Sequence, residues 1–183
     1  MIASLLLSPP DRVQLGALSL TGLPMPERAD DLAAVHTRLF GGLRPGFGLQ
    51  PPYESVWRGE RRMMGRSTQA VVEAYAKAGL WPETDGLPPD HVGVEVGFWA
   101  RLMAERDETA GRGDTIGAAR LDAQLRDFLA DHLLVWIPAW CQAVAADDPG
   151  GFYGTLATML GEQLEIAAGE LALADAEDAE ATS

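Results

Sequence analysis

The sequence feature that most constrains the fold is a long run with helical periodicity, from Arg120 to Ala146. Large side chains recur in it every three or four positions, which is the spacing of one face of an α-helix. They are Leu121, Leu125, Phe128, Leu129, His132, Leu133, Trp136 and Trp140. The run therefore predicts a long helix with one buried face. Because proline removes a helical hydrogen bond, Pro138 is expected to kink or split this helix.

The composition extends this helical prediction to the whole chain. Of the 183 residues, 52 are Ala or Leu, which favour helices, and 23 are Val, Ile or Thr, which favour strands. No run alternates between apolar and polar residues for long enough to predict a strand. A chain of this length suits one domain that buries its own core. We therefore predict an all-α, single-domain bundle of about seven to ten helices.

Proline, glycine and capping residues divide the rest of the chain into further helices and loops. One or two short helices, broken at Pro9-Pro10, are predicted between Ile2 and Leu20. The other predicted elements are helices over 26–39, 68–78, 90–106 and 152–171, long loops at 41–53 and 81–89, and a polar linker at 107–117. Ser67 is expected to cap the helix over 68–78, and Gly79 is expected to end it.

The net charge of −13 is unevenly distributed along the chain. Residues 161–183 carry seven acids and no base, so the remainder carries 20 acids against 14 bases. Residues 172–183 consist mainly of Ala, Asp and Glu, and we predict that they form a disordered tail after a helical domain of residues 1–171. An acidic chain lacks the cationic surface that nonspecific nucleic-acid binding requires, so no nucleic-acid partner is expected.

Cysteine usage and hydropathy indicate the compartment. Cys141 is the only cysteine, which excludes an intramolecular disulfide and a thiolate metal cluster, and its apolar surroundings favour a packed thiol. No run reaches 18 apolar residues, and the apolar start Met1–Leu7 is too short for a secretory signal and lacks a basic region. We therefore expect a cytoplasmic protein without stable membrane insertion.

The first candidate site is the junction Pro88–Glu95, where two prolines precede a helix start. Asp90 is placed to cap that helix by accepting hydrogen bonds from free backbone N–H groups. His91 and Glu95 are i,i+4 neighbours that can meet on one helix face. Two interpretations stay open at this point: a helix cap with a structural His–Glu pair, or a polar cluster that holds a ligand.

The second candidate site lies on the longest helix. His132 is one turn before Trp136 on an apolar face, where a histidine more often belongs to the core than to a binding site. Asp131 faces elsewhere and is not automatically its partner. The histidines His36, His91 and His132 fit no regular metal spacing, so no metal site is predicted.

The third candidate site ends the first long loop with two aromatic residues, Tyr53 and Trp57. Such side chains suit a recognition surface, and they equally suit anchoring of the loop to the core. Four arginines follow, which could hold a phosphate or could form a solvated face: Arg58, Arg61, Arg62 and Arg66.

Sequence motifs of common enzyme classes are missing. The chain has no P-loop, no GxGxxG after a strand, no HExxH, no CxxC and no GxSxG. Beside a general helical scaffold protein, two rival functions remain: a nucleotide-binding regulatory module that uses the arginines, and a small hydrolase that uses Asp90, His91 and Glu95 as acid–base groups.

Taken together, the three stretches resemble the TorD/DmsD/NarJ family of molybdoenzyme maturation chaperones. Pro88-Pro89-Asp90-His91 is similar to the Pro-x-Asp-His junction of that family, and Glu95 to the glutamate that follows it. His132-Leu133 with Trp136 and Pro138 resembles the later His-Leu-x-x-Trp-x-Pro pattern, and Tyr53–Val56 is also similar. The likeness spans roughly residues 30–165 in matching order and spacing.

The resemblance implies a TorD-like helical fold and a nonenzymatic chaperone without a cofactor of its own. Relatives bind the twin-arginine leader or the apo form of a molybdopterin oxidoreductase of the dimethyl sulfoxide reductase class, and hold it until its cofactor is inserted. Several relatives bind GTP weakly, although no phosphate loop here supports that property. The state of assembly, monomer or dimer, stays open. The resemblance places the client-binding site at Tyr53, Glu54, Trp57, Pro89, Asp90, His91, Glu95, Asp131, His132 and Trp136.

Overall fold

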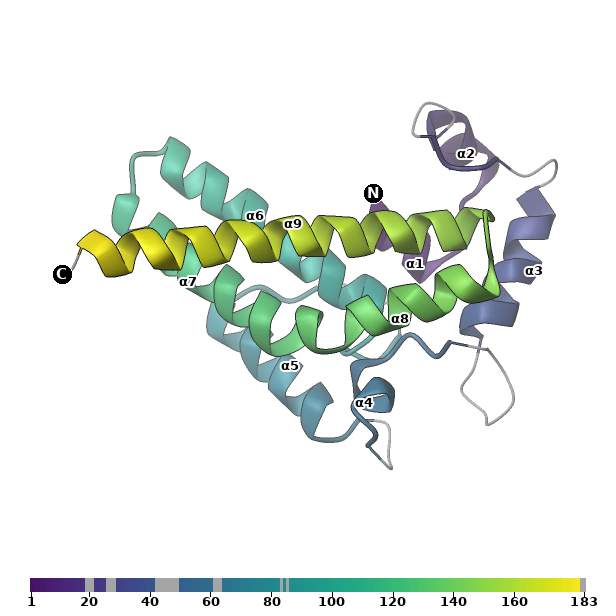
Figure 1. The fold of residues 1–183 in the computed structure, drawn as a ribbon, viewed down its shortest axis with the longest axis horizontal. Coiled ribbons are helices and arrows are strands. Elements are labelled where there is room, and N and C mark those ends of the chain that lie inside the picture. The colour runs from purple at the N-terminus through teal and green to yellow at the C-terminus, as the bar shows by residue number, and fades with distance from the viewer. Residues whose placement is uncertain are drawn as a thin grey trace.

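The computed structural model describes residues 1–18, 22–25, 29–41, 50–60, 64–82, 84 and 86–181. Within these residues the chain forms nine α-helices, one π-helical segment and no strand, which confirms the all-α prediction (Figure 1). The elements are α1 (Ile2–Leu7), α2 (Arg12–Leu18), α3 (Ala29–Phe40), α4 (Glu54–Trp57), α5 (Arg66–Ala78), α6 (Val92–Gly111), α7 (Thr115–Phe128), η1 (Leu129–Leu133), α8 (Leu134–Asp147) and α9 (Phe152–Ala181). Most of the loop predicted at 41–53 lies outside the described residues.

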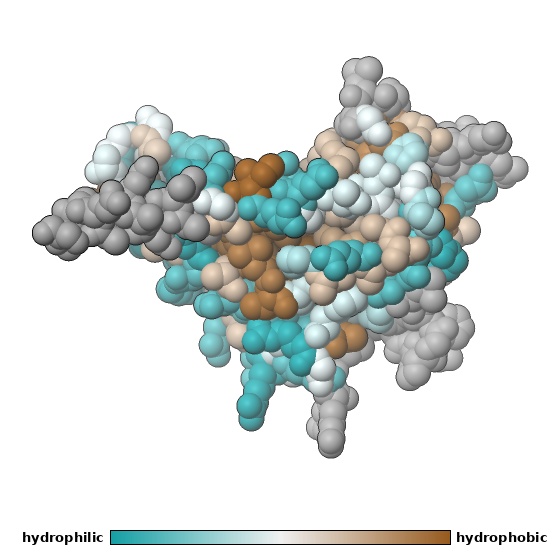
Figure 2. All heavy atoms as spheres, in the orientation of Figure 1, coloured by the Kyte–Doolittle hydropathy of each residue, from teal (hydrophilic) through white to brown (hydrophobic). Residues whose placement is uncertain are grey.

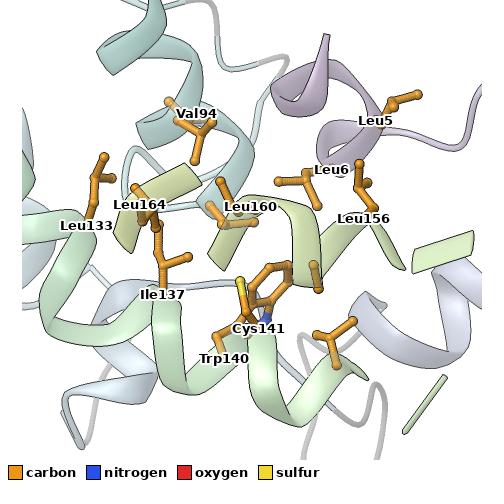
Figure 3. Packing of buried hydrophobic residues seen from close by; sticks show 14 of the residues in the cluster. Leu5, Leu6, Val94, Leu133, Ile137, Trp140, Cys141, Leu156, Leu160 and Leu164 are labelled. Atoms are coloured by element: carbon orange, nitrogen blue, oxygen red, sulfur yellow. The ribbon is translucent and has the colours of Figure 1, made fainter. Parts of the chain in front are cut away.

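The apolar core is centred on the long helix α9, which runs along almost the whole molecule with α8 packed beside it (Figure 1). Ile137 and Trp140 of α8 join Leu160 and Leu164 of α9 in one cluster, and each of the four is at most 3% exposed (Figure 3). Burial of an aliphatic side chain of this size contributes about 1.5–3 kcal/mol. Cys141 lies in the same cluster, and burial raises the pKa of its thiol to about 12, as expected for a packed cysteine.

The predicted long helix exists, but its irregular backbone lies elsewhere than expected. The chain stays helical through Pro138, and α7, η1 and α8 follow one another without a break. The departure from α geometry is the π-helical turn Leu129–Leu133, directly before Leu134. Because Pro138 cannot donate to the carbonyl four residues earlier, it is the carbonyl of Leu134 that loses its usual helical donor. The irregular turn lies at His132 and its neighbours rather than at the proline.

Among the described residues, the segment Thr115–Asp147 is long and apolar enough to cross a membrane by length and composition. Half of its most apolar window is buried inside the fold. Such burial is typical of the central helix of a packed core, so the segment is a weak indication of membrane insertion.

Three helix ends differ from the sequence prediction. Most of the linker predicted at 107–117 is helical, because α6 continues to Gly111 and Asp114 accepts a hydrogen bond from Gly117 N at 2.8 Å to cap α7. The helix predicted over 152–171 continues as far as Ala181 in α9, since Ala and Glu are strong helix formers. These differences lengthen helices without changing their order.

The start of α5 also differs from the prediction, whereas its end agrees. Ser67 does not cap the helix; instead its backbone N–H and its hydroxyl both donate to Oε1 of Glu60, in the turn before it. Gly79 ends α5 in the left-handed conformation, with φ of 70°, as predicted for a residue without a Cβ.

The first helix packs closely on the start of α6 and helps to fix its position (Figure 1). A Cβ at Gly93 would lie 2.8 Å from Cγ of Leu7 and 3.0 Å from the carbonyl oxygen of Ala3. The close approach of the two backbones therefore requires a glycine here, within the junction that the sequence singled out.

Candidate functional site

Five Asp, Glu and His side chains are buried where α4, the start of α6 and the π-turn η1 meet. We call them the buried polar cluster: Glu54, Asp90, His91, Glu95 and His132. None of the five is more than 6% exposed. Because burying charged groups is costly unless they are paired, the partners of each group decide what the cluster can do.

Asp90 caps a different helix from the one predicted. Its backbone oxygen accepts from the N–H of Glu54, and its Oδ2 accepts from the N–H of Ser55, both at 3.0 Å. It thus satisfies the first two N–H groups of α4, which is only four residues long. The residue that caps α6 is His91, whose Nδ1 accepts from Gly93 N at 3.1 Å.

Burial lowers the pKa of His91 to about 4, so its ring is neutral near pH 7. A neutral imidazole has one acceptor nitrogen, and the cap of α6 requires that acceptor at Nδ1. The predicted pair between His91 and Glu95 is wrong, because each of them bonds to a different element.

Glu54 connects the π-turn to α4. Its Oε1 lies 2.7 Å from a terminal nitrogen of Arg58, and its Oε2 lies 3.1 Å from Nδ1 of His132. The same Arg58 nitrogen donates to the backbone oxygen of Asp131 at 3.2 Å. His132 therefore has a specific buried partner, and the irregular turn that carries it is held from outside by Arg58.

Glu95 is fully buried and accepts a hydrogen bond from Trp136 Nε1 through its Oε2, at 3.1 Å. Its other oxygen has no hydrogen-bond donor among the described residues. Burial raises the pKa of Glu95 well above its usual value, and the neighbouring Glu54 raises it further. A neutral carboxyl suits this position, since its proton can be donated to the Glu54 carboxylate.

The remaining predicted residues brace the cluster. Tyr53 precedes α4, forms a β-bridge with His91 and packs edge-on against its ring, with the centroids 5.3 Å apart. Trp57 Nε1 donates to the carbonyl of Pro51 at 2.8 Å, and the carbonyl of Pro89 accepts from the Tyr75 hydroxyl at 2.9 Å. These bonds anchor the loop ends, which is one of the two interpretations left open for the aromatic pair.

A pocket of about 270 Å³ opens beside His132, between α5, α6, α7 and η1. We call it the His132 pocket. Its apolar residues include Phe98, Leu102 and Phe128. Its charged lining residues are Glu73, Lys77, Asp127 and Asp131, which are three acids against one base. Lys77 and Asp127 are paired at 3.0 Å, so the pocket keeps a negative balance.

Two of the predicted site residues, Asp131 and His132, line this pocket, and Glu54 lies directly behind His132. The lining acids Glu73 and Asp127 were not among the site residues predicted from the sequence. Their signal was the i,i+4 spacing of Glu73 with Lys77 and of Asp127 with Asp131, which places each pair on one helix face. The same spacing is typical of solvated helix faces, so it does not identify a pocket.

The arrangement bears on both rival functions, the nucleotide-binding module that would use the arginines and the hydrolase that would use Asp90, His91 and Glu95. Arg58 is engaged by Glu54, while Arg61 and Arg62 lie outside the described residues. Asp90 and His91 use their side chains as helix caps, and neither lines the His132 pocket. Among the described residues there is also no group of three or more His, Cys, Asp or Glu that could hold a metal ion.

A larger pocket of about 480 Å³ lies on the other side of α7, against α6 and α9. It is lined by Trp99, Met103, Leu125 and Leu129, with Arg106 and Asp122 among its charged residues. The view in Figure 2 shows hydrophobic atoms gathered in a band near the middle of the face that α9 crosses, with hydrophilic atoms around them. Apolar surface is thus available outside the His132 pocket.

Comparisons with known proteins agree with the fold and with the resemblance. A sequence model of the family described as nitrate reductase delta subunit matches residues 12–142. The chaperone protein TorD of Aeromonas salmonicida is 34% identical over 151 residues, which cover 80% of this chain and 64% of that protein. TorD of Photobacterium profundum is 30% identical over 113 residues, or 60% of this chain and 50% of that protein.

The fold is similar to the crystal structure of a proposed redox enzyme maturation protein from Archaeoglobus fulgidus. The TM-score is 0.54 at 22% sequence identity, and the likeness covers 90% of each chain. This comparison supports the helical architecture alone. The matched region spans less than two thirds of the length of either TorD relative.

Proposed function

Because the chain belongs to the nitrate reductase delta subunit family, we propose that it is a cytoplasmic, nonenzymatic chaperone for the maturation of a molybdopterin oxidoreductase. It binds the twin-arginine leader of the apoenzyme, or the apoenzyme itself, and holds it until the cofactor has been inserted. The cofactor belongs to the client.

The observation that carries this proposal is the combination of charge and apolar surface in the His132 pocket. A twin-arginine leader has a cationic stretch followed by an apolar one. Its receptor needs carboxylates for the guanidinium groups and apolar surface for the rest. The pocket offers Glu73, Asp127 and Asp131 at its lining, with Phe98 and Phe128 beside them.

The residues predicted for the site then divide into two roles. Asp131 and His132 contact the leader, because they line the pocket. Glu54, Asp90, His91, Glu95 and Trp136 are positioning residues, which hold α4, α6 and the π-turn in register. Tyr53, Trp57 and Pro89 brace the loops that carry them.

Isothermal titration calorimetry with a synthetic leader of a molybdopterin oxidoreductase encoded beside this chain tests the proposal. We expect a dissociation constant in the micromolar range or tighter, about −8 kcal/mol or better. The matched control is the same peptide with both arginines replaced by glutamine, which should bind at least tenfold more weakly. Equal binding of the two peptides, or no binding of either, would overturn the proposed function.

Ionic strength provides a second readout. If carboxylates recognise the arginines, the affinity should fall as the salt concentration rises, because screening weakens interactions between exposed charges. A titration with GTP followed by tryptophan fluorescence, in the same buffer, separates this function from the nucleotide-binding alternative.

A further inference from the structure

Of the surfaces and clusters in the described chain, the buried carboxyl pair behind the His132 pocket has chemistry that leader binding alone does not explain. Glu54 and Glu95 are both fully buried and influence one another electrostatically. Two carboxylates this close would repel strongly in a medium of low polarity, so the pair is more stable with one proton.

Within the part of the chain that the structure describes, the cations around the pair are too few to neutralise it. Arg58 binds Glu54, but it is shared with the backbone oxygen of Asp131. The other titratable groups that face the cluster are Asp90 and His91 from the junction, Tyr53 before α4, Tyr75 from α5, His36 from α3 and His132 from η1. Burial keeps His91 and Tyr75 neutral by lowering the pKa of the first and raising that of the second.

A connected path leads from the pair to the pocket. The Glu95 oxygen without a donor is the atom that can carry the proton, and its neighbour Glu54 accepts it. Glu54 in turn bonds His132 Nδ1 at 3.1 Å, and His132 lines the pocket. Only the side chain of His132 would therefore separate a cation bound in the pocket from the buried pair.

We propose that a guanidinium group entering the His132 pocket displaces the proton shared by Glu95 and Glu54, so that the site exchanges one proton for one bound cation. The proton leaves the carboxyl pair for the solvent, and the positive charge of the bound guanidinium stabilises the second carboxylate. This inference rests on the proposed function for the identity of the guanidinium, and it adds a regulation of that site by pH.

The test is calorimetry of the synthetic leader in buffers of different ionisation enthalpy, which counts the protons released per bound peptide. We expect release of up to one proton at pH 7, and an affinity that rises with pH by up to about tenfold per pH unit. Glu95→Gln should bind without this release, because its amide can accept from Trp136 and donate to Glu54 but has no proton to lose.

The matched control is Glu165→Gln, which removes an exposed carboxylate of α9 outside the His132 pocket. It should release as many protons as the unchanged protein. If the unchanged protein releases none, or if Glu95→Gln releases the same number, the inference is overturned while leader binding itself stands.

A second measurement uses argininamide and does not depend on the client. Infrared difference spectroscopy of the free protein should show a protonated carboxyl band that disappears when argininamide saturates the pocket and is missing from Glu95→Gln. A band that persists at saturation, a free protein without the band, or no binding of argininamide would each contradict the exchange.

Discussion

The chain contains two Asp–His dipeptides, Asp90–His91 and Asp131–His132, and the fold uses them in opposite ways. In the first, both side chains are buried and each accepts a backbone N–H at the start of a helix. In the second, the aspartate is exposed and lines a pocket, while the histidine is bonded to the buried carboxylate of Glu54.

The difference arises from where each dipeptide lies along its helix. Asp90–His91 precedes α6, next to the start of α4, and helix starts have unsatisfied N–H groups that side chains can cap. Asp131–His132 lies within a continuous helical segment, in the π-turn. Its side chains therefore project outward or across to another helix. The first dipeptide thus caps the two helix starts beside the pocket, whereas the second lines the pocket itself.

The largest expected effect that separates the two dipeptides is on stability. Asp90→Ala removes a charged acceptor and leaves the buried N–H of Ser55 without a partner, so we expect a loss of about 2–4 kcal/mol. Asp131→Ala is the matched control, because its side chain is exposed. Chemical denaturation measures both variants. Equal midpoints for the two would show that the dipeptides are not used differently.

Acid should reveal the next difference, because the pKa of His91 is about 4 in the fold and 6.5 in an unfolded chain. The neutral ring contributes stability that is fully present above pH 6.5 and is lost as the pH falls through about 4. Between pH 7 and pH 5 the loss is about 2 kcal/mol. His91→Asn should lack this component in denaturation series at several pH values. If the free energy of unfolding of His91→Asn depends on pH as steeply as that of the unchanged protein, the ring is not buried in its neutral form.

The cap itself is a smaller effect. His91→Ala should destabilise the protein by about 1–2 kcal/mol, since Gly93 N loses its acceptor at the start of α6. His91→Asn should recover most of that loss near pH 7, because asparagine is a favoured capping residue. If asparagine is as damaging as alanine, contacts of the ring with Tyr53, rather than the cap, hold the junction.

The two dipeptides also show which parts of the fold could be predicted from the sequence. Helices follow from local periodicity, which is why the run from Arg120 to Ala146 and the end of α5 at Gly79 were predictable. The partner of Asp90 was not, because Ser55 lies 35 residues earlier and on another helix. The sequence favoured capping of the nearest helix start, that of α6, whereas tertiary packing brings the start of α4 within hydrogen-bond distance of Asp90.

The candidate site, like the fold, was predictable from the sequence only in part. Local spacing predicted a pair of His91 with Glu95, but the buried carboxylate bonds Trp136, 41 residues away. No local sequence pattern predicted the π-turn that positions His132. The pocket lining from α5 was missed because an acid and a lysine at i,i+4 spacing are typical of any solvated helix.

The smallest effect on stability, and the sharpest on function, is expected at Asp131. Asp131→Asn should change the free energy of unfolding by less than about 0.5 kcal/mol, because it alters an exposed side chain whose backbone oxygen still accepts from Arg58. Leader affinity should nevertheless fall by about 3–10-fold and depend less on salt, since one carboxylate of the pocket is lost.

Glu165→Gln is the control for this measurement, as an exposed carboxylate on α9 outside the pocket. The comparison between the dipeptides requires the two quantities to separate: Asp131→Asn should weaken leader binding while leaving stability intact, whereas Asp90→Ala should reduce stability first. If Asp131→Asn and Glu165→Gln weaken binding equally, the effect belongs to the net charge of the protein. Recognition would then act through long-range attraction, and the acids of the His132 pocket would have no special part in it.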